Sequence, residues 1–128
     1  MKNLFEQYNS GKLSLPNKEV LFSDLKWNAH PTFEGVELKH ILTSKDTNGE
    51  FSYHLVRIAP NKSIGLHVHK EQLETHEIIA GNGYAVNDGV KLNYNPGVIS
   101  IFPKNIPHEV FAGEDGLYIF AKFFPALV

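Results

Sequence analysis

The sequence predicts an all-β domain of the sandwich or barrel type, such as a jelly roll. Short apolar runs recur along the chain, and each one ends at a cluster of glycine, proline, asparagine or aspartate. The runs have the length of strands, and the clusters contain the residues that turns require. About nine runs spaced in this way are typical of a β-sandwich or a small barrel. Only about the first twenty residues could be helical or loose.

The first strands are predicted at residues 36–43 and 51–59. We expect them to form a hairpin, because the Thr-Asn-Gly sequence at residues 47–49 has the composition of a tight turn. Residues 60–62, with the sequence Pro-Asn-Lys, then turn the chain into a strand at residues 64–69.

The rest of the chain continues the same alternation of apolar runs and turn residues. Gly-Asn-Gly at residues 81–83 and Asn-Asp-Gly at residues 87–89 each end a predicted strand, and residues 113–116 separate the last two. The strands delimited in this way are residues 74–80, 84–86, 90–94, 98–102, 108–112 and 117–124.

Length and charge limit the organisation and the partners. The chain has 128 residues, without an internal repeat or a linker, which predicts one domain over residues 1–128, with residues 1–20 as a candidate N-terminal arm. The formal net charge is −2 and the sequence pI is about 6.4, so we expect neither nucleic acid nor an anionic membrane as a partner.

The cellular compartment is predicted from three features that the sequence lacks: cysteines, a signal peptide and a membrane-spanning run. There are no cysteines, which excludes disulfides and thiolate ligands and fits a reducing compartment. The start of the chain has no apolar run long enough for a signal peptide. The most apolar stretch, residues 117–128, is interrupted by Lys122 and Pro125 and is too short to span a bilayer. We therefore expect a soluble, cytoplasmic protein.

A group of histidines and a glutamate carries the strongest functional signal. His67 and His69 are separated by one residue, so on a strand both imidazoles point to the same side. Glu74 follows five positions after His69, and His108 lies further downstream. A set of imidazoles and one carboxylate suits a divalent transition metal.

At these residues the chain resembles the cupin family. The first conserved cupin motif resembles the pattern His67-x-His69-x4-Glu74-x6-Gly81. Its leading glycine, Gly65, stands only two positions before His67, closer than is usual in the family. The motif core runs from about residue 65 to residue 112.

The second cupin motif resembles the pattern Gly97-x5-Pro103-x-Asn105-x2-His108. Asn105 stands where a glycine is usual, and Ala112 stands where an asparagine often closes the motif. The resemblance implies a double-stranded β-helix, the cupin type of jelly-roll barrel. It also implies that His67, His69, Glu74 and His108 are metal ligands. Fe(II), Mn, Ni, Zn and Cu(II) all suit such a set.

His76 is the candidate catalytic residue. Strand alternation places it on the same side as Glu74, facing the metal cavity. Its role could be to orient Glu74 or a bound water, to act as a general acid or base, or to serve as an alternative ligand. The competing structural interpretation is a histidine bonded to the backbone of a neighbouring strand.

Other polar residues receive weaker predictions. Arg57 could hold a substrate carboxylate if its face of the strand lines the pocket, but an exposed or inter-strand arginine is the preferred interpretation. His30 and His40 are expected to be ordinary surface or core-edge residues.

The leading functional hypothesis is a metal-dependent enzyme that acts on a small organic molecule. Dioxygenase (an oxidoreductase), lyase and isomerase reactions all occur on this scaffold, and the fold does not choose among them. The alternatives are a small-molecule-binding or sensing module without turnover, and a metal-free cupin of the sugar-epimerase type. We also predict a homodimer that uses edge strands, with residues 117–128 and the N-terminal segment as interface material.

Overall fold

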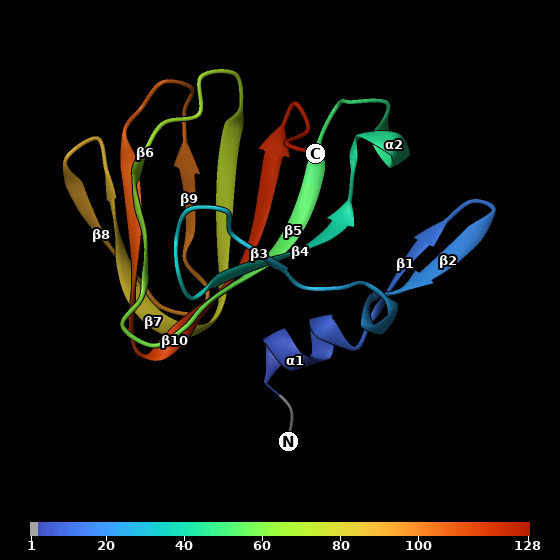
Figure 1. Cartoon of the computed structure of the whole chain (residues 1–128), viewed down its shortest axis with the longest axis horizontal. Helices are drawn as coiled ribbons and strands as arrows, with labels where there is room; N and C mark the ends of the chain where they lie inside the picture. The colour runs from blue at the N-terminus through green and yellow to red at the C-terminus, as the bar shows by residue number, and fades with distance from the viewer. Residues whose placement is uncertain (1–2) are drawn as a thin grey trace.

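The computed structural model describes residues 3–128 and shows a β-barrel with an N-terminal extension (Figure 1). Its helical segments are α1 (Leu4–Asn9), the 3-10 turn η1 (Phe22–Asp24) and α2 (Ser44–Thr47). Its strands are β1 (Lys12–Leu15), β2 (Lys18–Leu21), β3 (Asn28–Ala29), β4 (Val36–Leu42), β5 (Ser52–Ile58), β6 (Ser63–His67), β7 (Leu73–Asn87), β8 (Val90–Tyr94), β9 (Ile99–Phe102) and β10 (His108–Phe124). None of the helices in residues 3–128 is long and apolar enough to cross a membrane.

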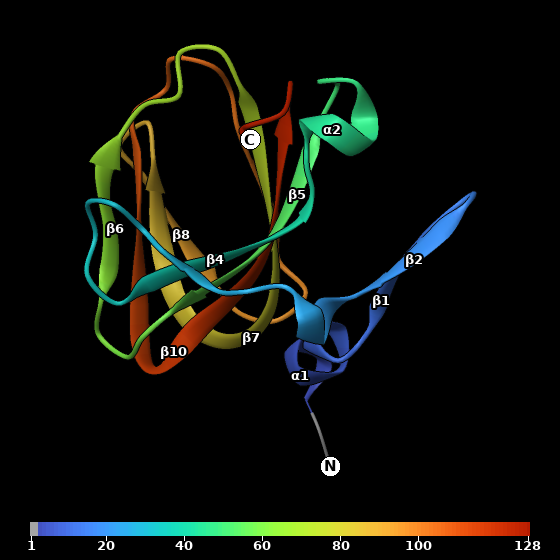
Figure 2. The same ribbon diagram turned by 45° about the vertical axis from the view of Figure 1, so that its right-hand side comes forward.

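Two long strands organise the barrel. In the main sheet the order is β3-β4-β5-β10-β7-β8, with β6 also paired to β10 and β9 also paired to β7. The first part of β10 pairs with β6, and its last part pairs with β5. Because β7 follows β10 along both parts, the sheet folds over on itself and encloses a core (Figure 2). The predicted all-β, double-stranded β-helix fold is confirmed.

The predicted breaks at residues 81–83 and 113–116 do not end strands. Instead β7 and β10 run on through them, and the pairing of the two strands shifts register between Ala112 and Leu117. A Cβ atom on Gly81 would collide with the carbonyl of Gly116, and one on Gly83 would collide with the carbonyl of Phe111. The glycines therefore allow two bending strands to approach closely, a role that composition alone does not separate from a turn.

The predicted hairpin is confirmed, with a different connection. Strands β4 and β5 are antiparallel partners, but the helical turn α2 precedes the expected tight turn. The Asp46 carboxylate accepts a hydrogen bond of 3.0 Å from the backbone N–H of Thr43. This is half of a capping box, the arrangement that starts a helix, and it explains the extra turn.

The candidate N-terminal arm is ordered where it is described; its first two residues lie outside the described residues. Lys39 of β4 is buried, and its ammonium group donates to Asn9 Oδ1 at 2.6 Å and to the carbonyl of Phe22 at 2.8 Å. Phe5 packs against the rings of Trp27 and Tyr118. These contacts hold α1 and η1 against the outer face of the barrel, while the β1–β2 hairpin points away from it (Figures 1 and 2).

Burial follows the alternation of the strands. On β7, Glu74, His76 and Ile78 are all buried, and the residues between them are partly exposed, as predicted. The interior core includes Val56, Ile119 and other apolar residues of the barrel strands. The run at residues 117–124 lies in β10 between β5 and β7, so both of its edges are paired.

His54 of β5 is buried between the barrel strands. Its Nδ1 atom lies 2.8 Å from Nδ1 of His40, and its Nε2 atom lies 2.8 Å from Oγ of Ser52. Burial and the nearby His40 lower the pKa of His54 from 6.5 to about 3, which keeps the ring neutral.

We predict that acid destabilises the metal-free protein partly through His54. Between pH 6.5 and pH 3 the unfolded chain binds a proton that folded His54 does not, so lower pH favours unfolding. The free energy of unfolding, measured with denaturant from pH 7 to pH 4, should fall as the pH is lowered. His54→Gln should reduce the slope of this free energy against pH by at most about 1.4 kcal/mol per pH unit. An unchanged slope in the variant would show that the ring titrates normally.

Candidate metal centre

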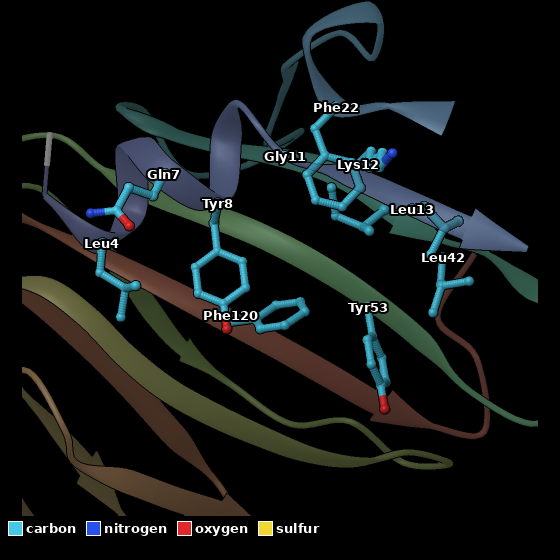
Figure 3. Close-up of a pocket in the computed structure, with 11 residues that line it drawn as sticks. Leu4, Gln7, Tyr8, Gly11, Lys12, Leu13, Phe22, Leu42, Tyr53 and Phe120 are labelled. Carbon is cyan, nitrogen blue, oxygen red and sulfur yellow. The ribbon is translucent and has the colours of Figure 1, made fainter. Parts of the chain in front are cut away.

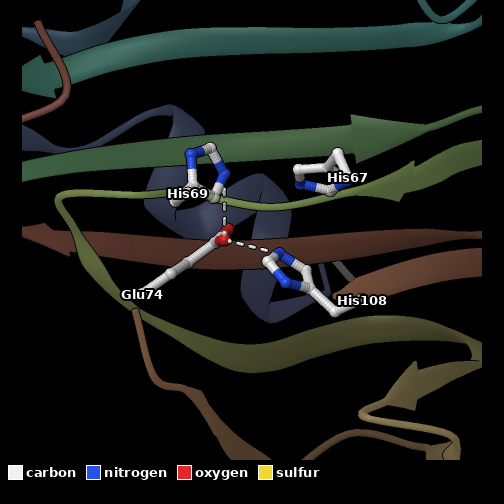
Figure 4. A group of neighbouring side chains, drawn as sticks. All are labelled: His67, His69, Glu74 and His108. Atoms are coloured by element: carbon white, nitrogen blue, oxygen red, sulfur yellow. Dashed lines mark hydrogen bonds and ion pairs between the residues drawn. The ribbon is translucent and has the colours of Figure 1, made fainter. Parts of the chain in front are cut away.

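Four side chains from three parts of the chain meet inside one end of the barrel (Figure 4). They are His67 at the end of β6, His69 in the following loop, Glu74 near the start of β7 and His108 at the start of β10. One ligand atom from each lies within 4.8 Å of the others. We call these four residues the His/Glu cluster.

Strand pairing brings the distant members together. His108 is the register partner of His67 in the β10–β6 pair, which places a residue of the second sequence motif beside the first. Their rings lie 4.3 Å apart between centroids. Because the pairing is fixed by backbone hydrogen bonds, the two imidazoles are neighbours before any ligand is present.

His69 reaches the cluster from a loop, because β6 ends at His67. Shared strand alternation therefore does not explain its position. The backbone N–H of Asn105 donates to the carbonyl of His69 at 2.9 Å and fixes this loop. Asn105 has φ of 64°, a left-handed conformation that asparagine tolerates, which explains how it occupies the place of the usual glycine.

Backbone carbonyls orient two of the imidazoles. Nδ1 of His67 donates to the carbonyl of Gly65 at 2.7 Å, and Nδ1 of His108 donates to the carbonyl of Ile106 at 2.9 Å. With a proton held on Nδ1, Nε2 is the atom through which each neutral ring can bind an ion, although in this structure Nε2 of His108 contacts Glu74 Oε1. The same backbone contacts fix the angle of each ring.

Glu74 is the centre of the polar contacts. Its Oε1 atom lies 3.1 Å from Nε2 of His108 and 3.4 Å from Nε2 of His69, and its Oε2 atom lies 2.7 Å from Nε2 of His76. Burial alone would raise the pKa of the Glu74 carboxyl, but the neighbouring His76 and His108 hold it well below its usual range. For His108 the directions are reversed. Burial alone would lower the pKa of this imidazole, but its hydrogen bonds to Glu74 and to the carbonyl of Ile106 raise the pKa above its usual value.

His76 connects Glu74 to a buried hydrogen-bond chain. Its Nδ1 atom lies 3.0 Å from the hydroxyl of Tyr94, and that hydroxyl bonds Oγ of Ser100. Only 2% of His76 is exposed. Burial, the largest influence, raises the pKa of Tyr94, so its hydroxyl keeps a proton and can donate it to His76.

These contacts separate the alternatives for His76. Its side chain bonds Glu74 and Tyr94 and not a strand backbone, and its ring nitrogens are not part of the four-residue cluster. The arrangement fits a residue that orients Glu74. Proton transfer to a substrate stays a prediction.

The donor set fits a transition-metal ion. Imidazole nitrogens and a carboxylate oxygen bind such ions at about 2.0–2.2 Å, so ligands on opposite sides of one ion are about 4.0–4.4 Å apart. The spacing of up to 4.8 Å in the cluster is close to this size. A carboxylate that is 6% exposed also requires positive charge or hydrogen bonds around it, and a cation would supply the charge.

A cavity of about 80 Å³ adjoins the cluster. His67, His69, Glu74, His76 and His30 line it together with apolar side chains that include Val36, Leu38, Val56, Ile64, Ile119 and Phe123. Arg57 is on the other face of β5, where it pairs with Glu37 at 3.0 Å and lies over the Trp27 ring. The preferred interpretation of Arg57, an inter-strand arginine, agrees with this placement.

Sequence reasoning missed two residues near the site. Tyr94 ends β8, and no local pattern shows that its hydroxyl reaches His76 across the barrel. His30 follows β3 and lines the cavity, although the sequence predicts an ordinary surface or core-edge residue. Only the placement of the N-terminal segment along the barrel reveals this position.

Comparisons with known proteins agree with the fold and the motifs. A family model described as a cupin domain matches residues 54–119, slightly more than half of the chain. No curated protein matches the sequence.

Solved structures are similar to the chain at low sequence identity. A predicted oxalate decarboxylase from Thermotoga maritima is 20% identical with a TM-score of 0.74, and the match covers 80% of this chain and 95% of that one. An RmlC-like cupin from Shewanella frigidimarina is 14% identical with a TM-score of 0.71, covering 91% and 96%. Ectoine synthase from P. lautus is 22% identical with a TM-score of 0.67, covering 74% and 67%. At these identities the likeness shows the fold.

We predict opposite protonation patterns for two kinds of histidine in the site. His67 should carry its proton on Nδ1, because a backbone carbonyl accepts from that atom. His76 should carry its proton on Nε2, because Tyr94 donates to Nδ1 and Glu74 accepts from Nε2. Nitrogen-15 NMR of the imidazoles in metal-free protein near pH 8 measures both directly. The same pattern in both rings would contradict the hydrogen bonding described above.

Proposed function

Because the chain belongs to the cupin family, we propose that it is a metal-dependent enzyme whose His/Glu cluster binds one divalent transition-metal ion and acts on a small organic molecule. The observation that carries the proposal is the convergence of three imidazoles and one buried carboxylate within 4.8 Å. Two of the imidazoles are held at Nδ1 by backbone carbonyls, as metal-binding histidines commonly are, so Nε2 is the ring atom that each would offer to an ion.

The side chains around the ion would each have a defined task. When bound, the ion supplies a Lewis acid that polarises a substrate oxygen or, if redox-active, a site for the activation of dioxygen. Glu74 keeps its negative charge because His76 and His108 stabilise it. His76 holds Glu74 Oε2 in place through Nε2, and Tyr94 holds His76. The apolar cavity walls exclude water from the reacting molecule.

The His76 contacts support a positioning role more directly than proton transfer. For His76 to protonate a substrate, its 2.7 Å hydrogen bond to Glu74 would have to break. Its other nitrogen faces Tyr94 and is not directed at the cluster.

The choice between an enzyme and a binding module depends on turnover. The proteins of similar structure include a predicted oxalate decarboxylase, an ectoine synthase and a polyketide cyclase, and these favour an enzyme without selecting one reaction. A stand-alone binding or sensing module would have the same cluster and cavity but would release its ligand unchanged. A metal-free cupin would lack the ion altogether.

The first experiment tests metal binding. Protein purified without added metal, then dialysed against each of Fe(II), Mn, Ni, Zn and Cu(II), should retain about one ion per chain by elemental analysis. His67→Ala should remove binding, because it deletes a ligand. His76→Ala, the matched change of a buried neighbouring histidine, should weaken binding by only about 10–100-fold. Wild-type protein that retains no ion would refute the proposal.

The second experiment tests turnover. The metal-loaded forms are incubated with small carboxylates, catechols and keto acids, and oxygen uptake and products are measured. We expect one form to show turnover that His67→Ala abolishes. Ligand binding without turnover in any metal form would instead establish the binding module.

We also propose that the protein is a homodimer formed through its N-terminal segment. Among the described strands, β1 and β2 pair only with each other, and such an isolated hairpin is only marginally stable in water. It carries the apolar residues Leu13, Leu15, Val20 and Leu21, and nearly half of Leu21 is exposed. A second copy of the chain would cover this surface.

An apolar groove next to the hairpin is the receiving surface for this contact. It has a volume of about 430 Å³ and lies between α1, the base of the hairpin and the outer face of the barrel sheet (Figure 3). Leu4, Tyr8, Leu13, Phe22 and Phe120 line it. Hairpin and groove are adjacent on one side of the molecule, so a two-fold axis can bury both in one contact.

Light scattering at micromolar concentration tests the dimer. We expect twice the chain mass for wild-type protein and the single mass for Leu13→Glu combined with Leu21→Glu, since two charges would then face the apolar contact. Ile101→Glu, at an exposed position of the edge strand β9, is the matched control and should stay dimeric. A monomeric wild type would refute the dimer, and dissociation by the control alone would move the interface to β9.

A further inference from the structure

His30 has a fixed hydrogen-bonding pattern that the proposed function does not use. It follows β3, and its backbone N–H donates to the carbonyl of Val36 at 2.8 Å. Its side-chain Nδ1 atom lies 3.0 Å from the backbone nitrogen of Thr32 and 3.2 Å from that of Phe33. A backbone N–H group can only donate, so Nδ1 of His30 must be an acceptor.

The position of the proton in this ring follows directly. An imidazole whose Nδ1 accepts hydrogen bonds carries its proton on Nε2, and the ring is neutral. None of residues 3–128 forms a hydrogen bond with Nε2 of His30 in the structure. His30 thus presents an unused N–H donor, and it cannot coordinate a metal through Nε2 without losing both bonds at Nδ1.

The His30 side chain adjoins the cavity beside the His/Glu cluster. His30 lines this cavity together with His67 and His69. Its ring packs on Phe33 at 4.8 Å, and Phe33 in turn lies 6.1 Å from the ring of His67. The remaining walls are hydrocarbon except for the cluster itself and His76, and the lining contains no lysine or arginine.

Size and charge restrict what can fill this space. A cavity of about 80 Å³ has room for only a few non-hydrogen atoms, since a site that binds benzene is about 150 Å³. A divalent ion with one carboxylate ligand leaves one net positive charge, which one negative oxygen donor balances. A second negative charge would rest against hydrocarbon without a counter-charge.

We propose that His30 is a substrate-binding residue whose Nε2–H group donates to an oxygen of a short monocarboxylic acid, or of its keto or hydroxy derivative. The inference rests on the proposed metal site, because the ion would hold the same molecule. The apolar walls contact the hydrocarbon chain, and His30 determines which oxygen faces the mouth of the cavity. His30 is separate from the cluster and does not hold the ion.

The first test needs neither metal nor substrate. Nitrogen-15 NMR of wild-type, metal-free protein near pH 8 should show His30 with Nε2 protonated and Nδ1 unprotonated. A proton on Nδ1 would overturn the proposal, because the side chain would then have no free donor.

The second test measures a ligand. Zinc-loaded protein is titrated with acetate, and affinity is read from chemical-shift changes of the cavity residues. His30→Phe should weaken acetate binding at least about 10-fold, the lower end of the usual value of a hydrogen bond to a charged group. His30→Gln, which keeps an N–H donor, should recover part of the loss. Glu34→Gln on the same loop is the control and should bind as the wild type does.

Two comparisons separate the possible failures. Malonate, which is acetate with a second carboxylate, should bind more weakly than acetate, and the reverse order would refute the ligand class. Zinc affinity, measured by competition with a chelator, should be equal in His30→Phe and wild type. If wild-type protein does not bind zinc, the proposed metal site fails. If it binds zinc and acetate, and His30→Phe binds acetate equally well, only the role of His30 fails.

Discussion

A buried carboxylate is the constraint on which the site depends. Glu74 lies inside the barrel with 6% of its surface exposed, and an isolated negative charge at such a position would be costly. The protein surrounds it with histidines, two that approach Oε1 and one that bonds Oε2. Each of these rings is itself held, either by a backbone carbonyl, by a fixed loop or by Tyr94. The chain thus assembles a group of donors whose spacing suits a single ion.

Two continuous strands make this assembly possible. Glu74 is near the start of β7 and His108 begins β10, and both strands bend through glycines where they approach each other closely. The bend lets one end of each strand support the cluster while the other end continues the opposite sheet. The barrel therefore fixes the spacing of the donors through main-chain hydrogen bonds, which are less variable than contacts between long side chains.

The polar and apolar groups of the cavity are segregated. The cluster supplies its polar wall, hydrocarbon side chains supply most of the rest, and His30 adds one donor near Phe33. Arg57, which could have neutralised a second anionic group, is directed to the outside and paired with Glu37. This arrangement restricts the range of ligands that fit the site more than the family resemblance does. With the proposed ion bound, it would combine room for few atoms, a single uncompensated positive charge and the proposed N–H donor of His30.

The sequence by itself determined the all-β class, the order of most strands, and the side of β7 on which Glu74 and His76 lie. These follow from the two-residue period of a strand and from local turn chemistry, which are both properties of neighbouring residues. The spacing of the two motifs also identified the four side chains that meet. Tertiary structure alone decided that residues 81–83 and 113–116 are bends within strands, because a glycine needed for close approach has the same sequence appearance as one needed for a turn. Tertiary structure also decided that His69 is held by a loop, that Tyr94 supports His76, and that His30 lines the cavity. Each of these depends on contacts between segments far apart in the chain. Local periodicity contains no information about such contacts.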